Sequence, residues 1–400
     1  MIQEELLISD LGRIVTGKTP STKKPEMFDG QYAFVTPTDL DWKTYNVRST
    51  ERTVSDAAKD AFRNQFIPAG SVLVTCIGAT IGKCGIATDE CLTNQQINSI
   101  VPAEPEDGRF IYYLLVHNTS LIRGIGLGGG AATPILNKTA FSNIRLRVPP
   151  KRHWASIADI LSAYDDLIEN NRRRIQLLEQ AARLLYKEWF VHLRFPGHEH
   201  TRIIDGVPEG WETGTIADLG EIITGKTPSK KKPENFGSDL PFIKTPDMHG
   251  NAIVVHTEES LSEEGAKTQA NKTLPPRSVL VSCIGTVGAV AFNASPAQTN
   301  QQINSIVPDS DLVTYWAYFM AKELKPLLEG IGGGATMANV NKSKFARISI
   351  VIPSKQLLIL FSNFAKPVFD QIENLSISNA RLAKARDLLL PKLMNGEIAV

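Results

Sequence analysis

Residues 11–28 read LGRIVTGKTPSTKKPEMF, and residues 219–236 read LGEIITGKTPSKKKPENF. These two stretches differ at only four of eighteen positions, so one is a copy of the other. The decapeptide TNQQINSIVP at 93–102 returns unchanged at 299–308. A repeat spacing of roughly 205 residues is far longer than a solenoid unit. The sequence therefore predicts a tandem duplication of a whole module.

The composition is that of an ordinary globular protein. The 400 residues are 42% apolar and 21% charged, with a net charge of +1, so bulk charge gives no general attraction to nucleic acid. Four cysteines without a C-x-x-C pair exclude a disulfide scaffold. The start, MIQEELLISD, has no apolar run, and the uncharged stretch 278–308 is interrupted by glycine, proline and amides. We therefore expect no signal peptide, no membrane span and a soluble, cytoplasmic protein.

Each module has a sheet-rich part followed by a helical part. The sheet-rich part mixes short β-branched runs with Gly, Pro and Asn, a pattern that predicts an α+β fold with long loops. The predicted strands are 71–77, 96–101 and 143–148 in the first copy and 278–284, 302–307 and 346–352 in the second. Helices are predicted at 110–117 and 312–328.

Prolines mark the change from sheet to helix, at Pro149-Pro150 and at Pro353. The predicted regions are a first sheet domain at 1–150, a central helical region at 151–200, a second sheet domain at 201–353 and a distal helical region at 354–400.

Each helical region is expected to contain a short helix and a restart. After a first helix at 151–161, Ser162 is typical of a new N-cap, with Asp165 three residues later. In the second copy Pro367 suits the first position of the restarted helix.

The long helices carry an apolar seam that alternates four- and three-residue steps. The seam residues are Tyr164, Ile168, Asn171, Ile175, Leu178, Ala182, Leu185 and Trp189 in the first copy, and Val368, Ile372, Leu375, Asn379, Leu382, Arg386 and Leu389 in the second. A seam asparagine is poorly tolerated against leucine and selects a like partner. An antiparallel pair with Asn171 beside Asn379 is therefore predicted, with Arg386 facing Tyr164 at a frayed end.

Two alternatives to this pairing stay open: a register shifted by one heptad, and two amphipathic helices on separate domains. With the antiparallel pair, the fold class is α+β, with two α/β domains related by a pseudo-twofold axis and separated by an antiparallel coiled coil of long helices.

Enzyme motifs are present only in fragments. Residues 12–19 satisfy the P-loop expression GxxxxGK[ST], as do residues 220–227, but proline follows and no helix is expected after Thr19. Asp309, Glu323 and Lys325 loosely mimic a nuclease site, but the first copy has no counterpart for them.

His198 and His200 in a Pro-Gly loop have no third metal ligand nearby beyond Glu199. The glycine motif and the Asn-Pro-Pro-aromatic element of a DNA methyltransferase are both missing. We therefore predict no catalytic residue, no metal and no cofactor.

A binding function fits the repeated loops better. Lysines and hydroxyls on stiff, proline-flanked loops suit phosphate contacts, and the Asn-Gln-Gln turns carry amides that can pair with adenine edges. The predicted DNA-binding residues are Thr16, Lys18, Thr19, Ser21, Lys23, Lys24, Asn94, Gln95 and Gln96 in the first copy, and Thr224, Lys226, Thr227, Ser229, Lys230, Lys231, Lys232, Asn300, Gln301 and Gln302 in the second. The equally weighted alternative is that the amides satisfy backbone groups of a buried turn.

The chain resembles the specificity (S) subunit of type I restriction–modification systems. The resemblance covers the whole chain and rests on IADILSAYDDLIENNRRRIQLLEQAARLLYKEWF at 157–190, LLLPKLMNGEI at 388–398, and the GKTPS and NQ elements of each half. It implies that the sheet domains are target-recognition domains, each reading half of a bipartite double-stranded DNA target. It also implies that the helical regions set the spacer and dock two methyltransferase subunits, that restriction subunits join the full complex, and that the chain itself performs no chemistry.

The two recognition domains are more alike than is usual in that family, which predicts a nearly palindromic target. Large side chains at the helix ends are expected to dock the methyltransferase subunits or to pack on the adjacent sheet domain: Tyr186, Trp189, Phe190, Leu390, Leu393 and Met394. The open alternatives are the specificity subunit of a related restriction enzyme that is not type I, a duplicated protein-binding scaffold and a duplicated NTPase.

Overall fold

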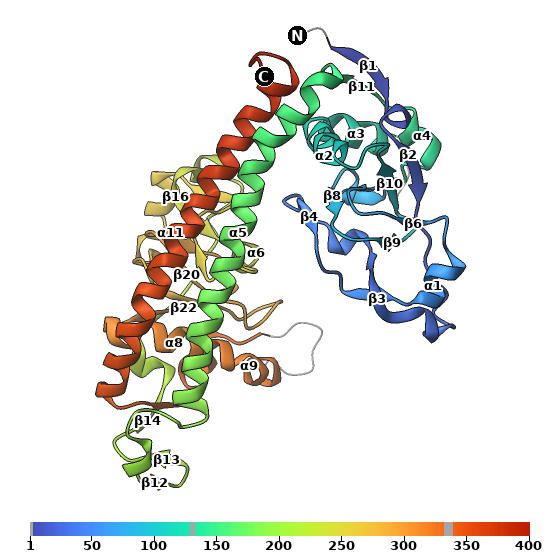
Figure 1. Cartoon of the computed structure of the whole chain (residues 1–400). Coiled ribbons are helices and arrows are strands. Elements are labelled where there is room, and N and C mark those ends of the chain that lie inside the picture. The colour runs from blue at the N-terminus through green and yellow to red at the C-terminus, as the bar shows by residue number, and fades with distance from the viewer. Residues whose placement is uncertain (1–2, 129–132, 332–338) are drawn as a thin grey trace. The chain divides into compact units, whose positions relative to one another are not determined.

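The computed structural model describes residues 3–128, 133–331 and 339–400 (Figure 1). The chain forms two compact units, Met1–Ile168 with Leu382–Val400, and Glu169–Arg381. These are called the first and the second unit below. Each unit contains one sheet-rich module and a segment of each of two long helices. Among the described residues, no helix is long and apolar enough to cross a membrane.

The described residues of the first unit form three sheets. The largest has five strands in the order β2-β10-β7-β8-β4 and is covered by helix α2 (Asp107–His117). Its strands are β2 (Arg13–Thr16), β10 (Ile97–Val101), β7 (Val72–Thr75), β8 (Cys84–Ala87) and β4 (Asn46–Val47). A four-stranded sheet has the order β5 (Arg52–Val54), β3 (Phe28–Val35), β9 (Cys91–Thr93) and β6 (Phe66–Ile67), and β1 (Glu4–Leu7) pairs with β11 (Arg145–Val148). The helices α1 (Asp56–Ala61), α3 (Thr119–Leu127) and α4 (Lys138–Ser142) complete the module.

The central strands of this sheet are apolar because both of their faces are covered. Every residue of β7 and β8 is buried. One face packs on α2, whose Phe110 and Ile111 are fully buried, and the other face builds a smaller core that includes Val35 and Leu73. Buried runs without polar alternation are what two covered faces require.

The second unit repeats this topology with the order β15-β22-β19-β20-β17. The strands are β15 (Gly220–Thr224), β22 (Ile303–Pro308), β19 (Val279–Ser282), β20 (Val290–Asn293) and β17 (Ile253–Val254). The smaller sheets are β18 (Glu259–Leu261), β16 (Phe236–Ile243) and β21 (Gln298–Thr299); β14 (Glu212–Thr215) with β23 (Ser349–Ile352); and the hairpin β12 (Ile203–Ile204) with β13 (Val207–Pro208). Its helices are α6 (Thr245–Met248), α7 (Glu263–Lys267), α8 (Asp311–Glu323), α9 (Lys325–Ile331) and α10 (Lys342–Ala346).

All six strands predicted from the sequence are present, each within its predicted range or one residue beyond it. The helix predicted at 312–328 is wrong in one respect, because it is divided into α8 and α9 around Leu324. The Lys325-Pro326 pair explains the break, since proline lacks the amide hydrogen and suits the first turn of a new helix.

The predicted helix restarts are wrong. Helix α5 (Trp154–Tyr186) and helix α11 (Lys355–Met394) are both continuous, and Lys151–His153 forms only a 3₁₀ turn. Ser162 is buried, and its hydroxyl donates back to the Asp159 carbonyl at 3.4 Å instead of capping a helix. Pro367 lies inside α11, between the buried residues Ala365 and Phe369 that hold this helix in the core. Tertiary packing has therefore overridden both local signals.

The predicted pairing of the long helices is confirmed within the second unit. Asn171 Nδ2 donates to Asn379 Oδ1 at 3.0 Å. The ring centroids of Tyr186, near the end of α5, and Phe361, near the start of α11, lie 6.2 Å apart. The end of one helix segment thus lies beside the start of the other, so the two run antiparallel. The contact between Asn171 and Asn379 fixes the predicted register.

The predicted environment of Arg386 is wrong. In the first unit its guanidinium is paired with Asp165, a carboxylate that is only 3% exposed, and with its exposed neighbour Asp387, and it does not lie at a frayed end. The Tyr113 hydroxyl donates to the same carboxylate at 2.6 Å. The seam pattern of two helices could not show this partner, because Tyr113 comes from α2 of the sheet domain.

Candidate nucleic-acid interface

Strand registers place four loops at one end of the five-stranded sheet of the first unit. Thr16, the last residue of β2, pairs with Asn98, and Ile97, the first residue of β10, pairs with Thr75 at the end of β7. β8 begins at this end beside Val74, and β4 runs parallel to β8. The loops that meet here are residues 17–24, 40–45, 76–83 and 94–96. We call this surface the loop end.

The second unit has an equivalent loop end. Thr224 pairs with Asn304, and Ile303 pairs with Ser282. The loops are residues 225–232, 248–252, 283–289 and 300–302. The topology thus gathers the repeated GKTP and NQQ motifs at one place in each unit, which the sequence alone did not show.

The GKTP loop is hydrogen-bonded to the NQQ turn. In the first unit the Lys18 amide donates to the Thr93 carbonyl at 2.8 Å, and the Thr19 hydroxyl donates to Gln95 Oε1 at 2.6 Å. The backbones approach so closely that a Cβ on Gly17 would lie 2.2 Å from the Asn94 carbonyl oxygen, which explains the glycine. The two motifs therefore form a single structural element.

The second unit reproduces this element bond for bond. The Lys226 amide donates to the Thr299 carbonyl at 2.9 Å, and the Thr227 hydroxyl donates to Gln301 Oε1 at 2.7 Å. A Cβ added to Gly225 would likewise lie 2.2 Å from the Asn300 carbonyl oxygen. The identical motifs of the two copies therefore form the same hydrogen-bonded structure.

The amides of the turn divide into structural and exposed groups. Asn94 Oδ1 accepts from the Gln96 amide at 3.0 Å, and Asn300 Oδ1 accepts from the Gln302 amide at 3.1 Å. These asparagines satisfy the backbone of their own turn, as the structural alternative expected. Gln95 and Gln301 lie at the exposed tip, where the threonine hydroxyl fixes the side-chain carbonyl and the Nε2 group retains hydrogens to donate.

The threonine hydroxyls just before each GKTP loop also have a structural role, because they bond to the neighbouring strand. Thr16 donates to Asn98 Oδ1 at 2.6 Å, and Thr224 donates to Asn304 Oδ1 at 2.6 Å. Gln96 and Gln302 are half-buried, and their side-chain carbonyls accept from Asn94 and Asn300 of their own turns. The predicted lysines and serines are exposed on the proline-flanked loops: Lys18, Ser21, Lys23 and Lys24 in the first unit, and Lys226, Ser229, Lys230, Lys231 and Lys232 in the second. Residues 17–24 are extended or in turns and the next helical turn is the 3₁₀ segment Pro25–Met27, so a P-loop is not formed.

Beneath each loop end a buried thiol accepts from an asparagine. Asn98 Nδ2 lies 3.2 Å from Cys76 Sγ. Burial raises the pKa of Cys76 to about 11 and the pKa of Cys283, its counterpart, to about 11. Both thiols stay protonated at neutral pH, so they offer neither a nucleophile nor a metal ligand. The loop end presents amides, hydroxyls and ammonium groups, a set that binds phosphates and base edges.

The predicted docking residues are largely used by the chain's own packing. Tyr186, Leu390, Leu393 and Met394 are buried, and Trp189 and Phe190 are half-buried. Tyr186 and Phe190 pack on the sheet-domain rings of Phe319 and Trp316. Packing on the adjacent sheet domain, the second of the two expectations, describes their contacts.

Sequence reasoning missed an exposed set of leucines on the long helices. They are Leu167, Leu177 and Leu184 on α5 and Leu360 and Leu388 on α11. The signal was available, because all five lie off the seam. It was obscured by the arginines and glutamates between them.

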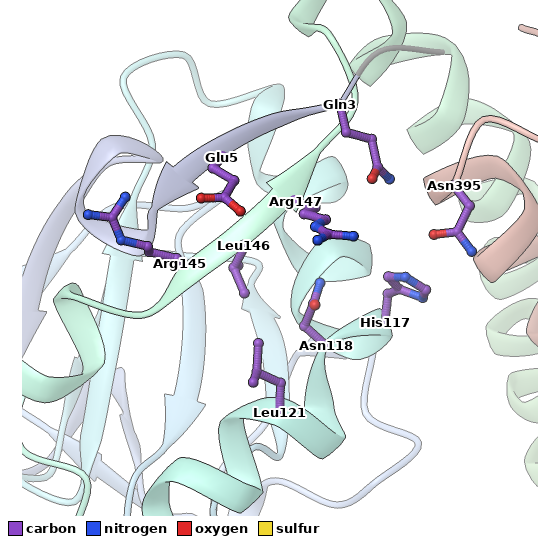
Figure 2. Close-up of a pocket in the computed structure, with 9 residues that line it drawn as sticks. All are labelled: Gln3, Glu5, His117, Asn118, Leu121, Arg145, Leu146, Arg147 and Asn395. Atoms are coloured by element: carbon purple, nitrogen blue, oxygen red, sulfur yellow. The ribbon is translucent and has the colours of Figure 1, made fainter.

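A polar cavity of about 270 Å³ lies beside the β1–β11 pair of the first unit (Figure 2). Arg147, His117 and Asn395 approach one side of it, while Glu5 and Arg145 lie along the strands. Burial lowers the pKa of His117. The second copy has Glu323, Ser349 and Val351 at the places of His117, Arg145 and Arg147, so this cavity is not a repeated feature.

A family model described as the type I restriction modification DNA specificity domain matches residues 4–180 and 208–366. The chain belongs to this specificity family. It is 34% identical over 353 residues to the type I restriction enzyme HindI specificity subunit of Haemophilus influenzae, covering 72% of this chain and 77% of that protein. It is 27% identical over 402 residues to the MjaIX specificity subunit of Methanocaldococcus jannaschii, covering 98% of this chain and 93% of that protein.

A solved structure agrees with this family at the level of the fold. The S subunit of a type I restriction–modification system from M. genitalium matches with a TM-score of 0.59, covering 98% of this chain and 96% of that one, at 14% identity. The specificity-family domain occurs twice in the chain, once in each module. The predicted family and the mixed α and β fold with two such domains are therefore confirmed.

Proposed function

We propose that this specificity-family chain is the DNA-reading subunit of a type I restriction–modification complex. Each sheet domain would read one half of a bipartite double-stranded target. The observation that carries this proposal is the repetition of the loop end, with the same hydrogen bonds between the GKTP loop and the NQQ turn in both units. Two readers that share the GKTP loop and the NQQ turn are expected to recognise the same bases, so the target is nearly palindromic if the helices present the readers in inverted orientation.

The loop residues divide into two roles. The exposed lysines and serines of 18–24 and 226–232 would contact phosphates, which fix the position of the protein without reading sequence. Gln95 and Gln301 would read base edges, because each is exposed and held in place by a threonine. A fixed amide can pair bidentately with adenine in the major groove.

The long helices would set the spacer and dock two methyltransferase subunits, to which restriction subunits are added in the full complex. The exposed leucines of α5 and α11 support this role, since neither unit covers them. The four regions 1–150, 151–200, 201–353 and 354–400 correspond to reader, spacer, reader and spacer. A subunit that reads genomic DNA in a bacterium or archaeon works in the cytoplasm, and the methyl transfer and cleavage belong to its partners.

The test is to co-express the chain with its methyltransferase partner and to sequence the methylated adenines. We expect one motif with two inverted halves and a fixed non-specific spacer. Two unrelated halves would refute the palindrome. Methylation that does not depend on the chain, or a purified complex without salt-dependent DNA affinity, would refute the reader role and favour a protein-binding scaffold.

A matched pair of variants sharpens this test. Gln95→Ala and Gln301→Ala each remove one amide from one reader. Each is expected to relax the corresponding base pair of its own half-site, by about 1–3 kcal/mol of discrimination. Different relaxed positions for the two variants would show that the readers are not equivalent.

A further inference from the structure

An exposed tryptophan at the loop end of the first unit is covered by two cations. Trp42 is 52% exposed. The Arg123 guanidinium lies 4.7 Å from its ring centroid, and Lys83 Nζ lies 5.9 Å from it. We call these three residues the Trp42 cluster. They come from three elements: the segment before β4, helix α3, and the residue before β8.

Backbone carbonyls fix both cations in place. Lys83 Nζ donates to the Leu40 carbonyl at 3.1 Å, and Arg123 Nη1 donates to the Ala79 carbonyl at 3.0 Å. Each cation has hydrogens left to donate. Within the described ranges, neither is ion-paired with a carboxylate. Two fixed and uncompensated cations attract an anion, and the aromatic ring limits their conformational freedom.

The second unit has lost this cluster. The segment before β17, residues 248–252, is one residue shorter than its counterpart at 40–45 and contains no tryptophan, lysine or arginine. Ala289 stands at the place of Lys83, and Glu329 stands at the place of Arg123. Lys325, the one cation added here, lies 3.9 Å from Glu329 and is thereby compensated.

We infer that the Trp42 cluster grips the phosphate backbone beside the half-site read by the first unit, and that the second unit makes no equivalent contact. This inference rests on the proposed DNA-reading function. The cluster lies at the same end of the sheet as the repeated loops, so DNA seated on them passes close to it. Phosphate contacts carry no information about the bases. The two units can therefore read the same bases while the first unit makes more phosphate contacts than the second.

The test measures the affinity of the complex with methyltransferase for duplex DNA carrying the mapped target, between about 50 and 200 mM salt. Each phosphate contact contributes about 0.9 to the slope of log affinity against log salt. Lys83→Ala with Arg123→Ala is therefore expected to reduce the slope by about 1.8. Trp42→Ala is expected to lower affinity by releasing both cations. The charge-preserving exchange Lys83→Arg with Arg123→Lys is expected to keep the slope, which separates loss of contact from loss of folding.

The matched control is Lys325→Ala, which removes a cation from the equivalent place in the second unit. The slope of log affinity against log salt for this variant should equal that of the parent complex within experimental error, since Glu329 already compensates that lysine. An unchanged slope in the Lys83 and Arg123 double variant, or an equal decrease with Lys325→Ala, would overturn the inference while leaving the DNA-reading function intact. A parent complex that does not prefer the mapped target would overturn the proposed function itself.

Discussion

The two units differ at one matched place where a long helix packs on its sheet domain: the first unit has a buried ion pair there, and the second unit has apolar side chains. In the first, Tyr113 and Arg386 bind the buried carboxylate of Asp165. At the corresponding positions the second unit has Phe319, Ala182 and Phe369, all fully buried. The Phe319 and Phe369 rings are 5.8 Å apart at 62°, an edge-to-face contact.

This difference teaches that duplicated modules need not keep duplicated cores. A buried ion pair adds little net stability, because desolvation offsets most of the attraction. It does discriminate between partners. If the end of α11 that carries Arg386 packed on Phe319 and Phe369, the guanidinium would lose Asp165 and face apolar rings. We therefore expect the ion pair to favour the packing of this helix segment on the first sheet domain over the second.

Removing the carboxylate is expected to have the largest effect. Asp165→Ala leaves Tyr113 without its acceptor and leaves Arg386 with the exposed Asp387 as its remaining carboxylate partner. The expected cost is about 3 kcal/mol in the free energy of unfolding, the lower end of the range for breaking a buried ion pair. Urea denaturation of the whole chain measures this loss. The matched control is Asp166→Ala at the exposed neighbouring position, which should change stability by no more than about 0.5 kcal/mol.

Three substitutions convert the charged core of the first unit into the apolar core of the second. Tyr113→Phe, Asp165→Phe and Arg386→Ala together give the first unit the residues of the second. Because a packed apolar core can replace a buried ion pair, the triple variant should be as stable as the parent or more stable by about 1–4 kcal/mol. A triple variant with a lower free energy of unfolding than Asp165→Ala alone would show that the two cores are not interchangeable.

The sequence predicted those features that repeat or that depend on helical period. Strand positions followed from β-branched runs, and the contact between Asn171 and Asn379 followed from the seam. The sequence did not predict the uninterrupted helices, because Ser162 and Pro367 carry strong local signals that packing overrides. It also missed the Arg386 environment, since the partner of a buried charge comes from tertiary contacts.

The candidate site was predicted in the same uneven way. The repeated motifs indicated the loop residues, but only strand register brings the GKTP loop and the NQQ turn together. Asn94 and Asn300 are indistinguishable from base-reading amides in the sequence, and only their hydrogen bonds identify them as turn residues. Trp42 drew no attention because it does not repeat.

A neutral polar pair provides a smaller test of how specificity is built into the helices. Asn171→Leu removes the group that donates to Asn379 Oδ1 in the seam, which should cost about 1–3 kcal/mol of unfolding free energy. The double variant Asn171→Leu with Asn379→Leu removes both groups and should recover most of that loss. Equal stability of the single variant and the parent protein, measured by urea denaturation, would show that this contact does not fix the register.

The smallest effect is expected at an exposed pair, Glu188 and Arg194, which is the surface counterpart of the buried one. Arg194 Nε and Nη2 donate to the carboxylate at 2.6 and 2.7 Å, and His192 contacts it at 3.1 Å. The hydrogen bonds from Arg194, then that from His192, lower the pKa of Glu188 to about 2. A lowered folded-state pKa contributes stability above the ordinary carboxyl pKa, and this contribution is lost as the pH falls towards 2.

Because water surrounds this pair, its contribution should be far smaller than that of Asp165. Arg194→Met is expected to raise the pKa of Glu188 towards its ordinary value of about 4.3, while stability at neutral pH hardly changes. A carboxyl-detected NMR titration of labelled glutamate measures the pKa, and thermal unfolding at pH 7 measures the stability. A large loss of stability with Arg194→Met would mean that burial does not separate the two ion pairs, and the contrast between surface and core charges would fail.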